Sequence, residues 1–89
     1  MATYNGWTNW ETWNVVVWME NEPATADDFR DASLRGADAA REYVETYVYE
    51  LFEGAPTTGL VGDWVRMALQ TIDWHEIAEH YEEDEENED

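Results

Sequence analysis

The chain contains no cysteine and no lysine, and its only permanently cationic side chains are four arginines. Against them stand 22 Asp and Glu residues, so the 89-residue chain has a formal net charge of -18 at pH 7. Without cysteine there is no disulfide, no thiolate chemistry and no Cys-ligated zinc. Without an excess of Lys and Arg, the chain repels the phosphates of nucleic acids and of anionic lipids. We therefore expect no direct binding to nucleic acid and no docking on a membrane.

Long apolar runs are also missing. No stretch approaches the roughly 20 residues that a helix needs to cross a bilayer, and no charged-then-apolar leader opens the sequence. The sequence therefore predicts a soluble, cytoplasmic protein. A chain of this length has room for one hydrophobic core, which we place in a single domain over residues 1–81. Seven of the eight residues in 82–89 are acidic, and such a block of like charge is expected to be disordered.

Two explanations of the acidity are open. In molar salt the Debye length falls to about 3 Å, so dense carboxylates repel one another little and keep the surface hydrated. Alternatively, the carboxylates form a functional surface that imitates a polyphosphate. The absence of Lys favours salt adaptation, because mimicry requires many acids but does not forbid Lys. The two explanations are compatible.

Capping signals and periodic apolar residues predict an all-α bundle of about four helices with a Trp-rich core. Thr8 and Glu11 have the spacing of a capping box and predict a helix over residues 9–20, which Pro23 ends. A long second helix is predicted from Thr25 to about residue 51. Gly36 costs that helix about 1 kcal/mol relative to Ala, which allows a kink or break near 34–37.

Two shorter helices complete the predicted bundle. The third, over residues 60–71, is expected to bury Leu60, Trp64, Met67 and Ala68, which recur at helical spacing. The fourth opens at Asp73, which has capping-box spacing to Glu76. No alternating run of β-branched residues predicts a strand.

The two histidines do not form a zinc-protease signature. His75 and His80 are five residues apart, which separates them by about 140° around a helix, whereas the zinc motif needs a spacing of four. No Ser-His-Asp arrangement and no Gly-rich phosphate loop is present. We expect no enzymatic activity, no metal and no cofactor.

Five aromatic residues crowd the first eighteen positions: Tyr4, Trp7, Trp10, Trp13 and Trp18. They either fill the core or form a hot-spot surface for a protein partner or for self-association. Trp7 and Trp18 are the two that we assign to partner binding.

A row of acids follows the predicted long helix. Its members are Asp27, Asp31, Asp38, Glu42 and Glu45. On one straight helix the row spans roughly 27 Å, comparable to about eight base pairs, and it can therefore present carboxylates at phosphate-like intervals to a basic groove. The alternative is the ordinary solvated face of an amphipathic helix.

Two blocks of sequence carry a resemblance. Residues 4–18, YNGWTNWETWNVVVW, resemble the Y-N-G-W-T-N-[YW]-E-T-W-N-V opening of an uncharacterised family of small phage, plasmid and haloarchaeal proteins. A weaker block, residues 71–79, resembles a segment near that family's end. Together they cover about a quarter of the chain. The resemblance implies a mobile-element or halophilic source and brings no established activity, so no site residue is carried over.

Two functional hypotheses result. The first is a non-enzymatic acidic protein that engages a basic, nucleic-acid-handling host protein, in one form as a DNA mimic that inhibits it. The second is a small halophilic structural or adaptor protein, acidic only through salt adaptation, whose partner face is the first helix and which is a monomer or a homodimer.

Overall fold

A computed structural model describes residues 4–51 and 59–86, and within those ranges the chain forms five α-helices and no β-strand. The all-α class is confirmed. The helices are α1 (Trp10–Asn21), α2 (Ala26–Arg35), α3 (Ala37–Leu51), α4 (Gly59–Thr71) and α5 (Trp74–Glu86). None of these helices is long and apolar enough to cross a membrane. Ahead of α1, Tyr4 and Trp7 pair their backbones around a tight turn at Asn5 and Gly6, both with positive φ.

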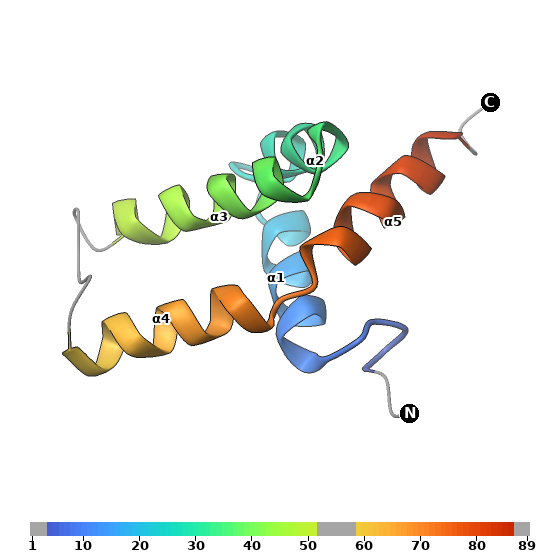
Figure 1. The fold of residues 1–89 in the computed structure, drawn as a ribbon. Helices are drawn as coiled ribbons and strands as arrows, with labels where there is room; N and C mark the ends of the chain where they lie inside the picture. The colour runs from blue at the N-terminus through green and yellow to red at the C-terminus, as the bar shows by residue number, and fades with distance from the viewer. Residues whose placement is uncertain (1–3, 52–58, 87–89) are drawn as a thin grey trace.

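The predicted count of four helices is wrong because the long helix is broken at Gly36. Gly36 has φ 128°, a conformation that L side chains rarely adopt, and its amide donates to the carbonyl of Ser33. Its own carbonyl then accepts from the amide of Ala40 and starts α3. Figure 1 shows α2 almost end-on while α3 runs across the view, so the two helices differ in direction. The chain therefore changes direction at Gly36, and α2 and α3 are separate helices.

The core lies where α2, α3 and α5 pack together, with α1 crossing them. Phe29 of α2 and Ile77 of α5 are completely buried at its centre. The ring of Tyr81 meets the ring of Phe29 edge-on, with centroids 5.8 Å apart. Around them pack aliphatic side chains of α1 and α3, such as Val16 and Val44.

The predicted Trp-rich core is not found. Of the six Trp side chains, only Trp74 counts as buried, and its indole N–H donates to the carbonyl of Leu69 at 2.8 Å. Trp10, Trp18 and Trp64 are 48%, 67% and 59% exposed. Aliphatic residues with Phe29 and Tyr81 fill most of the core instead, and the two remaining tryptophans, Trp7 and Trp13, are half-buried.

Helix α4 buries a different face from the one predicted. Leu60, Trp64 and Met67 are exposed and Ala68 is half-buried, whereas Leu69 is buried. The helix is apolar over a wide arc, so the sequence alone did not determine which part of that arc faces the core. Helix α4 packs chiefly against α1, and Figure 1 shows α3 and α4 extending to one side of α1 while α5 extends to the other.

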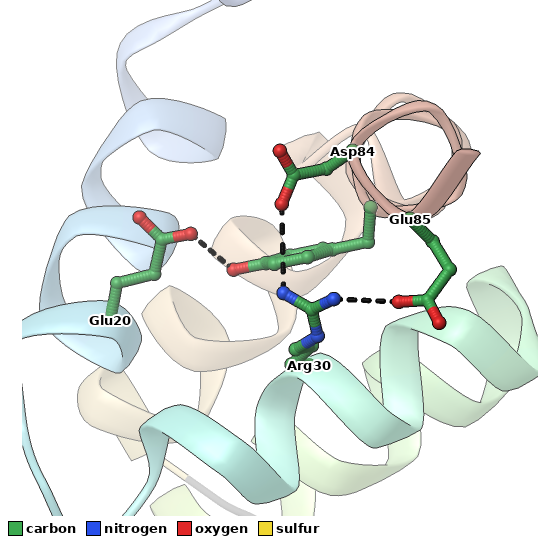
Figure 2. Close-up of polar contacts among 5 residues, drawn as sticks. Glu20, Arg30, Asp84 and Glu85 are labelled. Atoms are coloured by element: carbon green, nitrogen blue, oxygen red, sulfur yellow. Dashed lines mark hydrogen bonds and ion pairs between the residues drawn. The ribbon is translucent and has the colours of Figure 1, made fainter. Parts of the chain in front are cut away.

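The acidic end of the chain is helical further than expected. Helix α5 continues to Glu86, so the structure describes residues 82–86 as helix where disorder was expected, whereas 87–89 lie outside the described residues. Figure 2 shows the guanidinium of Arg30, on α2, between the carboxylates of Asp84 and Glu85, at 3.5 and 2.6 Å. This cation offsets part of the like-charge repulsion that the sequence argument relied on.

Candidate protein-interaction surface

The start of α1 is fixed by Asn9, not by Thr8 as predicted. The Asn9 side-chain oxygen accepts from both the amide and the hydroxyl of Thr12, at 2.9 and 2.6 Å. Its amide group donates to the carbonyl of Thr71, the last residue of α4, at 2.9 Å. The backbone N–H of Thr8 donates to the carboxylate of Glu76 at 3.0 Å. The carboxylate that meets Thr8 therefore comes from α5.

The start of α5 is tied to the same place. The Thr12 hydroxyl accepts from the backbone N–H of Asp73 at 2.9 Å. The Asp73 carboxylate accepts from the amide of Glu76 at 3.0 Å, which confirms the predicted cap of this helix. We call Asn9, Thr12, Thr71 and Asp73 the helix-start network. It holds the beginnings of α1 and α5 and the end of α4 together.

Trp7, one of the two tryptophans assigned to partner binding, is half-buried in an intramolecular contact. Its ring lies 4.9 Å from the imidazole of His80 on α5. In the same segment the ring of Tyr4 lies 4.9 Å from that of Trp13. Trp7 also borders a hollow of about 400 Å³ beside the acidic face of α5, lined in part by Glu79. Its observed contacts fasten the N-terminal turn to α5.

An apolar groove of about 210 Å³ opens between α1, α3 and α4. Its floor is made of buried side chains, including Val15, Val44 and Leu69, while Trp10 and Trp18 are exposed along the α1 side. The full lining is Trp10, Glu11, Asn14, Val15, Trp18, Met19, Val44, Tyr47, Val48, Val65, Ala68, Leu69 and Ile72. Apart from the hydroxyl of Tyr47 and the indole N–H groups, the polar side chains in the lining are those of Glu11 and Asn14. This apolar groove is the candidate interaction surface.

Trp18, the other tryptophan assigned to partner binding, lies in the apolar groove. Trp10 lies there as well; it was predicted as part of the aromatic cluster but was not one of the two tryptophans assigned to partner binding. The sequence does contain a signal for Trp10. Asn14 and Trp18 follow it by four and eight residues, which places the three side chains in one row of α1. That row flanks the buried face of the helix, which includes Val16.

The five acids proposed as a phosphate-like row are divided between two helices. Asp27 and Asp31 lie on α2, and the other three lie on α3. Asp27, Asp31, Asp38 and Glu42 are exposed, and Glu45 is half-buried. Because Gly36 turns the chain between the two groups, the straight 27 Å row predicted for one helix is not formed. None of these acids lines the apolar groove.

The titratable side chain of Tyr81 lies in the core, away from the groove. The hydroxyl of buried Tyr81 donates to the carboxylate of Glu20 on α1. Burial, and then this hydrogen bond, raise the pKa of Tyr81 above its ordinary value. Among residues 4–51 and 59–86, no group of three or more acidic or histidine side chains is placed to hold a metal ion.

These features define a small all-helical protein with an acidic surface and an open apolar groove. The chain belongs to a family of unknown function, DUF7249, whose model matches residues 1–88. No curated protein and no solved structure matches the chain.

Proposed function

We propose that this is a non-enzymatic protein that binds a protein partner through its apolar groove. The observation that carries the proposal is the exposure of Trp10 and Trp18, at 48% and 67%, beside a groove whose floor is apolar. Tryptophan is one of the residue types enriched at interface hot spots, which lie in well-packed, desolvated pockets. Exposed apolar surface gathered at a groove is typical of an interaction site.

The charge of the chain sets the kind of partner. At -18, the protein attracts basic surfaces over long range, which accelerates association and is weakened by added salt. A basic, nucleic-acid-handling host protein fits this requirement. The exposed carboxylates of Asp27, Asp31, Asp38 and Glu42 support a stronger form, in which they occupy phosphate-binding positions of that partner and the protein acts as a DNA mimic. In this form the two helices present two short acidic groups.

The opening motif and the missing lysines favour a second candidate, a halophilic adaptor from a mobile element or a haloarchaeon. Its acidity would serve solvation in molar salt. Circular dichroism across a KCl series separates the two: full helicity in dilute buffer favours a charge that serves binding, whereas folding only near molar KCl favours salt adaptation.

Affinity capture tests the proposed function. The bait is the wild-type protein, the Trp10→Ala/Trp18→Ala double variant, or Glu82→Gln as a control at an exposed position of α5 away from the groove, each exposed to lysate of the source organism. We expect the same protein on the wild type and on Glu82→Gln, and its loss from the double variant. Equal recovery on all three baits, or no partner on any of them, would overturn the proposal.

A further inference from the structure

We infer that the occupant of the apolar groove is a single amphipathic α-helix of the partner, with Lys or Arg beside its apolar face. This inference rests on the proposed function and specifies it. It commits to the secondary structure of the ligand, to its length and to the sign of its charge.

Along both walls of the groove, the lining residues recur at helical spacing, which matches the spacing of side chains on a bound helix. On α1 the outward row runs Trp10, Asn14, Trp18. On α4 the lining runs Val65, Ala68, Leu69, and Ile72 follows directly after the helix. Eight residues of α1 between its two tryptophans span about 12 Å, slightly more than two helical turns. A partner helix with apolar side chains at positions i, i+4 and i+7 has anchors over the same length.

Backbone chemistry also favours a helix. An extended peptide gains affinity by pairing with a sheet edge, and the described residues offer no strand to pair with. In the groove, an extended backbone would lose hydrogen bonds to water and regain few from apolar side chains. A helix satisfies its own amides and carbonyls, so only its side chains need to fit the groove.

Charge selects a basic helix over a second copy of this chain. Glu11 is the charged residue in the lining; it is half-exposed and follows Trp10 in the sequence. A Lys or Arg next to the partner's apolar face is attracted to this carboxylate and to the overall charge of -18. A second copy would bring another -18, and a symmetric dimer would add a second Glu11 to the same interface.

Labelled peptides test the inference by fluorescence anisotropy, at the lowest KCl concentration at which circular dichroism shows the helical fold. The first probe is a peptide of about 16 residues with Leu at i, i+4, i+7 and i+11 and with Lys and Ala elsewhere. The second has the same composition in scrambled order, which keeps the charge and removes the apolar face. The third keeps the leucines and replaces Lys with Glu.

We expect the basic amphipathic peptide to bind about tenfold more tightly than either of the others, and to lose about tenfold in affinity with Trp18→Ala. Glu11→Gln should weaken it more than Glu82→Gln, which removes the same charge at an exposed position of α5 away from the groove. Equal binding of the scrambled peptide would show attraction by charge alone and would overturn the inference. Insensitivity to Trp18→Ala, or a dimer that Trp18→Ala dissociates in light scattering, would overturn it as well.

The outcome separates the two proposals. If a captured partner depends on Trp10 and Trp18 while no helical peptide binds, the groove binds proteins but the helical ligand is wrong. If capture and peptide binding both fail, the proposed function itself is wrong.

Discussion

The hydroxyl of Thr12 accepts a hydrogen bond from the backbone N–H of Asp73 at 2.9 Å, across 61 residues of sequence. Thr12 is completely buried, and its hydroxyl also donates to Asn9 at 2.6 Å. The two blocks that carry the sequence resemblance, residues 4–18 and 71–79, therefore meet at the helix-start network. In this structure the polar residues of the opening motif join α1 to the end of α4 and the start of α5.

Replacing Thr12 by Val tests this role. The variant keeps the shape of the side chain but leaves the amide of Asp73 without its acceptor and Asn9 without one donor. We expect the free energy of unfolding to fall by about 1–3 kcal/mol, measured by urea denaturation. Thr46→Val, on an exposed position of α3, is the matched control and should change it by less than about 0.5 kcal/mol. Equal effects of the two substitutions would contradict the network.

Ser33 is expected to respond in the opposite direction. Its hydroxyl is completely buried and makes no hydrogen bond within the described part of the chain. Ser33→Ala removes that cost and improves helix propensity, so stability should rise by about 1 kcal/mol. Thr25→Val is the contrast, because the buried Thr25 hydroxyl donates to the carbonyl of Met19 at 2.8 Å. A loss of stability in Ser33→Ala as large as that in Thr25→Val would refute this assignment.

Arg30 is expected to hold the end of α5. Arg30→Gln removes the ion pairs with Asp84 and Glu85, which are partly exposed and worth up to about 1 kcal/mol. Amide hydrogen exchange over residues 82–86 should become about two- to fivefold faster, and added salt should narrow the difference. Arg41→Gln makes the same change of charge at an exposed position of α3 and should leave that exchange unaltered. Faster exchange in both variants would indicate net charge as the cause.

Tyr81 predicts a loss of stability in alkaline solution. Burial, followed by the hydrogen bond to Glu20, raises its pKa in the folded protein above the unfolded value near 10. The stabilisation is fully present below pH 10 and is lost as the pH rises further, because the unfolded chain releases the proton first. Between pH 9 and 11.5, the free energy of unfolding measured in urea should fall less steeply with pH in Tyr81→Phe than in the wild type. The two slopes should differ by up to about 1.4 kcal/mol per pH unit.

Titration of Tyr43 does not affect the comparison of the two pH profiles. Burial and then the nearby carboxylate of Asp28 also raise the pKa of Tyr43, but Tyr43 titrates in both proteins. Its contribution therefore cancels in the difference between wild type and Tyr81→Phe. Parallel pH profiles for the two proteins would contradict the account of Tyr81.

The sequence predicted local features better than packing. The helix over residues 9–20, the Asp73 cap and the helical class depend on neighbouring residues, and the structure reproduces them with shifts of one position. Which apolar residues are buried depends on distant partners. Helix α1 is apolar nearly all round, so its period did not distinguish Val16, which is buried, from Trp18, which is exposed.

The remaining differences have the same origin. Gly36 signalled a weak point, but whether the chain kinks or turns there depends on how α2 and α3 both reach α5. The helix through residues 82–86 is contacted by Arg30, which is more than 50 residues away in the sequence and pairs with Glu85. The number of acidic residues in 82–89 gives no information about that contact.

The indole N–H signals of the protein in a nitrogen-15 NMR spectrum test the central claim most directly, when the captured partner or the basic amphipathic peptide is added. A ligand in the apolar groove should shift the signals of Trp10 and Trp18 and leave that of Trp74, bonded to the carbonyl of Leu69, in place. A bound ligand that leaves Trp10 and Trp18 unchanged, and shifts Trp7 or Trp64 instead, would contradict the account.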